Sequence, residues 1–381
     1  MSKLPDRRQW RTNRGGFTAL TSAVILLWGI PSCGNAPAGR MHDPVGSLTS
    51  IPMRVGRALH TATRLADGRI LIVGGGTPES PIPSAELLDL AAKSSKLIPM
   101  SAGRVGHTAT LLPDGSVLVV GGGYGIAATT RSAELFEVAT EQFRPVGRMV
   151  DARTDHVAVL LGTGKVLIAG GDPSGDGSSP VASAELYDPS TERFQRTGSM
   201  IAPRRPYGAV SMLDGTVLIA GGTSTSKRIF ADAEVYDPTR GQFRSVGPLN
   251  HPREKHAAGL LRDGRVIIAG GSDGQSVSDR LVSTEFFDPR TGRFTAGPNL
   301  GTPRHKVTAV AVSDGSLLVA GGGPNLAEFL DPLGSRFEPV SAVQNIERFY
   351  PAAVTLTDGG VFISGGYTRG GSQRDTWVVR R

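Results

Sequence analysis

Short apolar runs alternate with glycine-containing turns along most of the chain. Seven of these runs end in a double glycine, with successive pairs separated by about fifty residues. The pairs are Gly74-Gly75, Gly121-Gly122, Gly170-Gly171, Gly221-Gly222, Gly270-Gly271, Gly321-Gly322 and Gly365-Gly366. A run this short and this rich in β-branched residues is typical of a strand that is buried on both faces. A fixed period of this length predicts a ring of small β-sheets.

Each repeat has the same internal order of polar and apolar positions. An arginine comes first, and five residues later an alanine marks the first strand. A two-residue turn such as Asp67-Gly68 or Asp263-Gly264 is then predicted before the buried second strand. The third strand carries a glutamate, and the fourth begins at a phenylalanine such as Phe194 or Phe243. The pattern predicts an all-β protein, a seven-bladed β-propeller with four antiparallel strands in each blade.

Two side chains recur at fixed places in this repeat, and we interpret them as structural. The arginines are Arg57, Arg104, Arg153, Arg204, Arg253 and Arg304, with Arg348 in the seventh repeat. The glutamates are Glu86, Glu134, Glu185, Glu234, Glu285 and Glu328. Because buried charges are normally paired, six arginines and six glutamates favour ion pairs within or between blades. The alternative is a ring of guanidinium groups that attracts a carboxylate or phosphate to the channel mouth.

These motifs together resemble the kelch repeat, over nearly all of the chain that follows the N-terminal segment. The leading arginine, the double glycine and the third-strand motif Ala184-Glu185-Leu186-Tyr187-Asp188-Pro189 carry the resemblance. The sequence departs from it where phenylalanine replaces the usual tryptophan and where Leu88 and Leu330 replace the third-strand tyrosine. The chain is most similar to bacterial exported kelch proteins and to the propeller of galactose-oxidase-like proteins.

The two ends of the repeat region complement each other. The seventh repeat stops after its third strand, at Thr376–Arg380, so it lacks a fourth. The stretch Pro44–Met53 is similar to the ends of other fourth strands, such as Pro145–Met149. We therefore expect this N-terminal strand to dock beside the last strand and to close the ring, which removes exposed sheet edges.

The first 33 residues have the pattern of an export signal. A basic segment precedes an apolar stretch of about 14 residues, Phe17–Ile30, which is short for a transmembrane span. The stretch ends in Pro31-Ser32-Cys33, which resembles a bacterial lipobox; in that family the cysteine is lipidated and becomes the N-terminus. An ordinary cleaved signal is the alternative. We predict a signal peptide at 1–33, a linker at 34–41 and one propeller at 42–381.

The patterns of charge and of metal-ligating residues argue against nucleic-acid binding and metal binding. The formal charge of +7 owes much to the arginines near the N-terminus, and no aromatic–basic stripe indicates nucleic acid. Histidines recur three residues after the arginine in four repeats, but equivalent positions in a ring are too far apart to share one metal. The loop that begins at Asp172 lacks the final glutamate of a calcium loop. We predict no metal and no cofactor.

Ligand recognition is expected in the variable loops between strands two and three. Strand polarity places these loops at the same end as the double glycines and the repeated arginines. Loops on a rigid scaffold commonly carry binding residues, and aromatic and arginine side chains dominate binding energy. The candidates are Tyr124, Arg131, Arg228, Arg280, Arg348, Tyr367, Arg369 and Arg374.

Two classes of function remain. The first is a non-enzymatic scaffold of the cell envelope, or a secreted one, that binds protein or carbohydrate at the strand 2–3 loop face. The second is a metal-free carbohydrate-active enzyme similar to the sialate-mutarotase kelch proteins, with arginines and a glutamate at the channel mouth. A third class, a copper enzyme similar to galactose oxidase, is disfavoured. The copper site of that family uses a tyrosine linked to a cysteine. The only cysteine here is Cys33, within the signal.

Overall fold

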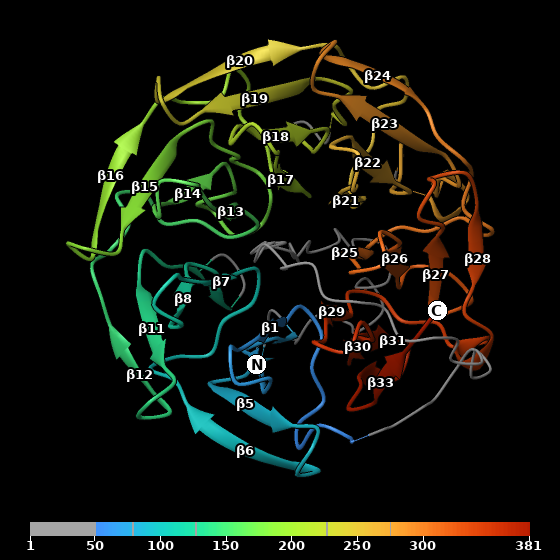
Figure 1. The fold of residues 1–381 in the computed structure, drawn as a ribbon. Coiled ribbons are helices and arrows are strands. Elements are labelled where there is room, and N and C mark those ends of the chain that lie inside the picture. Colours follow the sequence, from blue (N-terminus) through green and yellow to red (C-terminus); the bar gives the residue numbers. More distant parts are fainter. Residues whose placement is uncertain (1–50, 78–79, 126–127, 226–227, 275) are drawn as a thin grey trace, which may run out of the picture.

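Seven blades, six of four strands and the last of three, surround a central axis in the computed structural model (Figure 1). The structure describes residues 51–381, apart from residues 78–79, 126–127, 226–227 and 275. Strand one of each blade is innermost and strand four lies at the rim, as Figure 1 shows. The prediction of an all-β, seven-bladed propeller is confirmed.

The strands of each blade follow one another antiparallel from the axis outward. The first strands are β1 (Thr61–Arg64), β7 (Thr108–Leu111), β13 (Val157–Leu160), β17 (Ala209–Ser211), β21 (Ala257–Leu260), β25 (Thr308–Ala311) and β29 (Ala352–Thr355). The second strands are β2 (Ile70–Val73), β8 (Val117–Val120), β14 (Val166–Ala169), β18 (Val217–Ala220), β22 (Val266–Ala269), β26 (Leu317–Ala320) and β30 (Val361–Ser364). The third strands are β5 (Ser84–Asp89), β11 (Ala133–Glu137), β15 (Ala184–Asp188), β19 (Ala233–Asp237), β23 (Thr284–Asp288), β27 (Ala327–Leu330) and β33 (Thr376–Val379). The fourth strands are β6 (Ser94–Pro99), β12 (Gln142–Pro145), β16 (Arg193–Thr197), β20 (Gln242–Val246), β24 (Arg293–Ala296) and β28 (Phe337–Pro339).

Short elements decorate the loops between strands two and three. Three of these loops form small hairpins, and the loop of blade 5 contains a 3-10 turn, η1 (Val277–Asp279). A second 3-10 turn, η2 (Ser341–Val343), lies in the connection from blade 6 to blade 7. The hairpins are β3 (Gly76–Thr77) with β4 (Ser80–Pro81), β9 (Gly123–Gly125) with β10 (Ala128–Thr129), and β31 (Tyr367–Thr368) with β32 (Gly371–Ser372). No helix long and apolar enough to cross a membrane occurs in the part of the chain that the structure describes.

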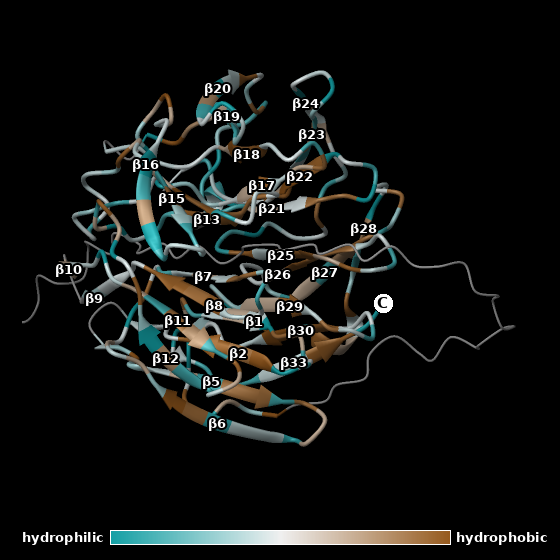
Figure 2. Cartoon of the chain, turned by 60° about the vertical axis from the view of Figure 1, so that its left-hand side comes forward, coloured by the Kyte–Doolittle hydropathy of each residue, from teal (hydrophilic) through white to brown (hydrophobic). Residues whose placement is uncertain are grey.

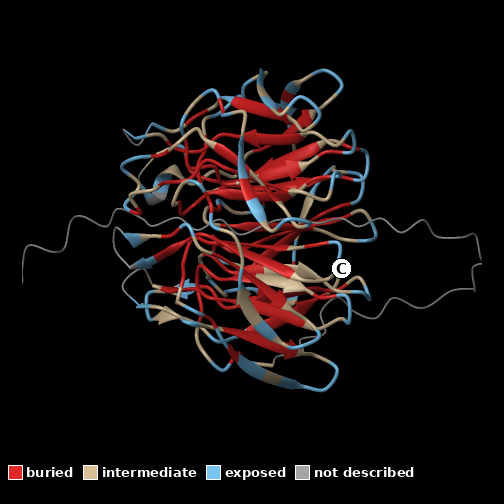
Figure 3. Cartoon of the chain, turned by 90° about the vertical axis from the view of Figure 1, so that its left-hand side faces the viewer, coloured by how far each residue is buried: buried red, intermediate tan, exposed pale blue. Residues whose placement is uncertain are grey.

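The hydrophobic core lies between blades. Seven clusters of buried side chains each join two neighbouring blades; one packs Val157 and Val159 of β13 against Val217 and Ile219 of β18. Second strands are the most apolar, in brown in Figure 2, and all of their residues are buried. Figure 3 shows the buried residues inside the body and the exposed ones mainly on loops and at the rim. Every blade therefore depends on its neighbours for burial, which fixes the spacing of the loops at each end.

The predicted two-residue turn between strands one and two is wrong in detail. In blade 1 the strands end at Arg64 and resume at Ile70, and the Gly68 amide donates to the Leu65 carbonyl oxygen, 3.1 Å away. Only the glycine takes a left-handed conformation, with φ of 89°. The turn is a longer one closed by glycine, and the Asp67 carboxylate accepts from the Arg69 amide at 3.0 Å.

The described end of the N-terminal stretch lies against the last blade. The Met53 amide donates to the Arg374 carbonyl oxygen at 2.9 Å, as the Met149 amide does to Arg131 in blade 2. The Thr376 hydroxyl donates to the Ile51 carbonyl oxygen at 2.6 Å and accepts from the Ile51 amide at 3.2 Å. Residues 51–53 thus take the place of a fourth-strand end beside β33. Residues 44–50, the linker and the predicted signal with Cys33 lie outside the described residues.

Candidate functional site

The side chains of the repeated arginines lie inside their own blades and bind the backbone at the end of the second strand. In blade 5, Arg253 Nη1 donates to the Gly270 carbonyl oxygen at 2.8 Å, and Nη2 donates to Glu285 at 2.7 Å. Five blades share this buried ion pair, at 2.7 to 2.9 Å. In blade 1 the Arg57–Glu86 separation is 3.9 Å, and burial lowers the pKa of Arg57 to about 10 despite that glutamate. These six guanidinium groups are buried and engaged inside the blades.

The paired glutamates also hold the connections between blades. Glu185 accepts from the Val150 amide at 2.6 Å, and Glu234 accepts from the Ile201 amide at 2.7 Å. The side chains of Val150 and Ile201 remain 39% and 62% exposed. The buried ion pair therefore fixes the backbone of a connection whose apolar side chain projects to solvent.

The seventh arginine has a different environment. Arg348 Nη2 donates to the exposed carboxylate of Asp375 at 2.6 Å, and its guanidinium lies 5.4 Å from the Trp377 ring centroid. Its side chain is 14% exposed. Arg348 therefore stands nearer to solvent than the other six, with a partner that a ligand could displace.

The histidines connect neighbouring blades through hydroxyl groups. His60 lies 2.8 Å from the Ser364 hydroxyl, and His156 lies 3.0 Å from the Thr108 hydroxyl. Burial lowers the pKa of His60, His107 and His256 to about 3, with the ring arginines adding to the effect. Each ring is therefore neutral at physiological pH.

A second ring of residues surrounds the axis at the arginine end of the blades. It consists of the residues two positions after the arginine, and most of them have a left-handed backbone: Leu59, Gly106, Asp155, Lys255, Lys306 and Tyr350. Main-chain hydrogen bonds join some of them directly, from Lys306 N to Lys255 O and from Tyr350 N to Lys306 O. We call this end of the axis, with the residues one and two positions after each arginine, the axial mouth.

One half of the axial mouth is charged. Arg205 lies 3.7 Å from Asp155, and Lys255 lies 2.6 Å from Glu254, which also accepts from the Tyr207 hydroxyl at 3.1 Å. Burial alone would lower the pKa of Arg205, but Tyr207, Asp155 and Glu254 outweigh burial and raise it. Blades 3, 4 and 5 therefore bring a network of acids and bases to the axis.

The other half of the axial mouth is apolar. Ala58, Leu59, Val105 and Tyr350 form one buried cluster, and Phe349 packs against it. Burial raises the pKa of the Tyr350 hydroxyl well above its usual value. The mouth is thus divided between an apolar side from blades 7, 1 and 2 and a charged side from blades 3 to 6.

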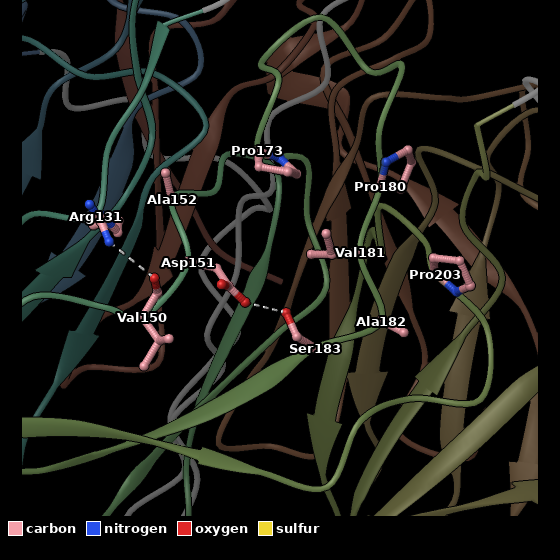
Figure 4. A pocket seen from close by; sticks show the side chains of 10 residues that line it. All are labelled: Arg131, Val150, Asp151, Ala152, Pro173, Pro180, Val181, Ala182, Ser183 and Pro203. Atoms are coloured by element: carbon pink, nitrogen blue, oxygen red, sulfur yellow. Dashed lines mark hydrogen bonds between the residues drawn. The ribbon is translucent and has the colours of Figure 1, made fainter.

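A groove of about 720 Å³ lies at the same end, where the connections around blade 3 meet (Figure 4). Arg131, Val150, Asp151, Ala152, Pro173, Pro180, Val181, Ala182, Ser183 and Pro203 line it. Arg131 Nη1 donates to the Val150 carbonyl oxygen at 3.4 Å, and Asp151 accepts from the Ser183 hydroxyl at 2.7 Å, as Figure 4 shows. Its walls are mainly proline and aliphatic side chains, with one cation and one carboxylate.

The other loop candidates are distributed over several blades. Tyr124 is 42% exposed and donates to Thr130 at 2.6 Å, whereas Arg228 is exposed over the Phe230 ring, 5.2 Å from its centroid. Arg369 and Arg374 are exposed in blade 7, and Tyr367 is 37% exposed. Arg280 reaches from the blade 5 loop to the Phe349 ring. These residues share one end of the molecule, and only Arg131 lines the groove.

Sequence reasoning missed the charged residues of the axial mouth. The signal was present: inside an otherwise fixed repeat, the two positions after the arginine change in every copy. They read Ala-Leu, Val-Gly, Thr-Asp, Arg-Pro, Glu-Lys, His-Lys and Phe-Tyr. Variation at a fixed place in a repeat marks surfaces that do not hold the scaffold together.

The fold is a seven-bladed β-propeller, and its repeats are similar to the kelch motif. The Kelch motif family model matches residues 204–250, the fourth copy of the repeat. No curated protein matches the chain by sequence. The fold is widespread, with 965 chains of solved structures matching it. One is a fungal alcohol oxidase of the AA5 family in complex with copper, 17% identical, with a TM-score of 0.72 over 88% of this chain and 76% of that one. At this identity the likeness concerns the fold alone.

A copper centre does not fit the residues that the structure describes. They contain no group of three or more histidine, cysteine, aspartate or glutamate side chains placed to hold a metal ion. The histidines nearest the axis are buried in separate blades, and three of them lie against hydroxyl groups. We derive no chemistry through a metal.

Proposed function

We propose that this chain is an exported binding module, anchored to a membrane at Cys33, that holds a protein or carbohydrate ligand at the strand 2–3 loop face without chemical turnover. The groove around blade 3 carries this proposal. Its volume of about 720 Å³ lies within the range of ligand sites. Rigid walls of proline and valine limit the entropy lost on binding, and Arg131 supplies a polar anchor.

The surroundings of the groove favour recognition over catalysis. Val150 and Ile201 add exposed apolar surface beside it, at positions held by the buried glutamates. Asp151, its carboxylate, is engaged by Arg196 at 2.8 Å and by Ser183 at 2.7 Å. A carboxylate with these partners is a poor general base, because its charge is already stabilised.

A thermal-shift screen of the protein tests this function. The ligands are neutral sugars, anionic sugars and cell-envelope fragments, since a ligand of the native state raises the melting temperature. Ala152→Trp, which fills the groove, should abolish the shift. Arg369→Ala, an exposed change outside the groove, should leave it intact. A shift that survives Ala152→Trp would place the binding site elsewhere.

The anchor is tested separately by Cys33→Ala in a bacterial host. The variant should lose lipid labelling and move from the membrane fraction to the soluble exported fraction. Unchanged fractionation would contradict the lipid anchor and leave the groove proposal standing.

The axial mouth favours a second candidate, a metal-free carbohydrate-active enzyme similar to the sialate-mutarotase kelch proteins. The observation is the network of Asp155, Arg205 and Glu254 at the axis, beside the Tyr207 hydroxyl. Paired acids and bases can exchange protons with a sugar hydroxyl and ring oxygen. Interconversion of sugar anomers, followed by NMR, should be accelerated by the protein and slowed by Glu254→Gln. Rates equal to those in buffer would remove this candidate.

A further inference from the structure

Three nitrogen-bearing side chains surround the ring of Phe349 at the axial mouth. The Arg280 guanidinium lies 5.1 Å from the ring centroid and the Lys306 ammonium lies 5.6 Å from it. The His305 ring is 5.5 Å away, edge to face. They come from the blade 5 loop and the connection into blade 6. We call these four residues the Phe349 cluster.

Among the residues that the structure describes, two of the three side chains have a buried nitrogen without a hydrogen-bond partner, and the third has no ion pair. Arg280 Nε and His305 Nδ1 are buried and have no hydrogen-bond partner. The Lys306 ammonium has no ion pair within the part of the chain that the structure describes; its neighbours are the rings of Phe349 and Tyr350, the latter 5.1 Å away. Buried polar groups usually have partners, so these two buried nitrogens, beside an ammonium group without an ion pair, leave room for an additional hydrogen-bonding partner.

Charge at this place points to an anion. Burial and the charges of Lys255 and Arg280 lower the pKa of Lys306 to about 8, against a weaker effect of Glu254. Glu254 is already bound to Lys255 at 2.6 Å. Burial and the cations Lys306, Arg280 and Lys255 also lower the pKa of His305, to about 3, so this ring is neutral. The cluster therefore holds more positive than negative charge.

The chemical class of the anion is indicated by Glu347, whose carboxylate already lies near Arg280. Glu347 lies 3.6 Å from Arg280 Nη1, and its side chain is half exposed. A carboxylate can thus reach this guanidinium, and the contact is loose enough to be exchanged for a shorter, charge-assisted one. Phe349 also packs against the apolar half of the mouth, at Leu59, Val105 and Tyr350. The group attached to the carboxylate would face that half.

We propose that the Phe349 cluster is a subsite for the carboxylate of a small aromatic or aliphatic acid, bound by Lys306 and Arg280 with its apolar part against the apolar half of the axial mouth. This subsite is independent of the groove and of the proposed function. A bound carboxylate satisfies the ammonium and the guanidinium together, in surroundings where aromatic rings exclude water and strengthen both contacts.

Titration calorimetry of the full-length chain with benzoate and its neutral isostere benzamide tests the proposal. At pH 7 benzoate should bind, and benzamide should bind at least about tenfold more weakly, because it forms no charged hydrogen bonds. Inorganic phosphate should not displace benzoate. Equal affinity for the two isosteres, displacement by phosphate, or the absence of benzoate binding would each overturn the proposal.

Substitutions at Lys306 give a signature that a folding defect cannot imitate. Lys306→Met should abolish benzoate binding, whereas Lys165→Met, which removes a lysine paired with Asp188 at 3.0 Å, should not affect it. Raising the pH from 7 to 9.5 should weaken binding to the natural chain about thirtyfold, as the Lys306 ammonium loses its proton. Lys306→Arg should retain binding and lose this pH dependence, because arginine stays charged. Unaltered affinity in Lys306→Met, or the same pH dependence in Lys306→Arg, would contradict the role of Lys306.

Arg131→Ala should leave benzoate binding unchanged, so the proposals for the groove and for this subsite can be tested separately.

Discussion

The double glycines are positions where the backbone of one blade meets that of the next. Gly270 has φ of 63°, and a Cβ atom there would lie 2.7 Å from the Arg304 carbonyl oxygen of blade 6. Both the left-handed conformation and the contact exclude a branched side chain. The repeat therefore keeps glycine where the buried second strand turns into the loop face.

Gly270→Val should destabilise the protein by at least about 3 kcal/mol, since valine adds backbone strain and a clash with a main-chain oxygen. Arg369→Ala should change stability by less than about 0.5 kcal/mol, because Arg369 is exposed at the tip of the β31–β32 hairpin. Urea unfolding of both variants measures the difference. Similar unfolding midpoints would contradict the assigned role of Gly270.

The buried histidines make stability depend on pH. They stay neutral in the folded protein down to about pH 3, whereas in the unfolded chain they take a proton below about pH 6.5. Between these values the unfolded state binds more protons, so stability falls as the pH decreases. Each histidine adds at most about 1.4 kcal/mol per pH unit to this dependence.

His107→Gln should reduce the loss of unfolding free energy between pH 7 and pH 5, because one protonation site of the unfolded chain is removed. The comparison of natural and variant chains cancels the contribution of carboxylates. Urea unfolding at pH 7, 6 and 5 gives both slopes. Identical slopes would show that His107 is protonated inside the fold.

The functional residues were harder to predict from the sequence than the scaffold residues. The repeated arginines and glutamates are visible because each copy contains them at the same offset. The axial residues Asp155, Arg205 and Glu254 occur once each, about fifty residues apart. Packing of neighbouring blades brings them together, so their proximity is a property of the three-dimensional arrangement.

At the scale of elements, strand order and number followed from the repeat, whereas turn geometry did not. Asp-Gly at the end of a first strand is compatible with a tight two-residue turn and with a longer turn that glycine closes. The structure has the longer turn, in which the aspartate accepts from the amide two residues later, as Asp67 does from Arg69. Local sequence alone does not distinguish the two, because both need glycine with positive φ.

One threonine makes two of the hydrogen bonds between residues 51–53 and the last blade. The Thr376 hydroxyl both donates to Ile51 and accepts from it, and its residue is buried. Thr376→Val should cost about 1–2 kcal/mol of unfolding free energy, because it leaves backbone groups of Ile51 unsatisfied. The same change at Thr110, a buried hydroxyl without a hydrogen-bond partner, should be neutral or stabilising. Equal effects at the two threonines would contradict the role of Thr376 in closing the ring.

At the scale of the whole molecule, the position of the core predicts cooperative unfolding. Each of the seven clusters is shared by two blades, so no blade buries its apolar surface alone. Loss of one blade would expose the faces of two others. The ring is closed as well, so when one interface between blades is lost, the other blades are not expected to stay folded on their own.

Phe287→Ala provides the test, because Phe287 of blade 5 fills the cluster shared with blade 4, far along the chain from Trp377 of blade 7. The change should cost about 3–5 kcal/mol. With Trp10 and Trp28 replaced by phenylalanine, Trp377 fluorescence reports blade 7 while circular dichroism reports all strands. If the ring unfolds as one unit, both transitions move to lower urea by the same amount. A dichroism transition that shifts while the Trp377 transition stays in place would show that blades unfold separately. In that case the loop face could not act as the rigid platform that the groove and the axial mouth require.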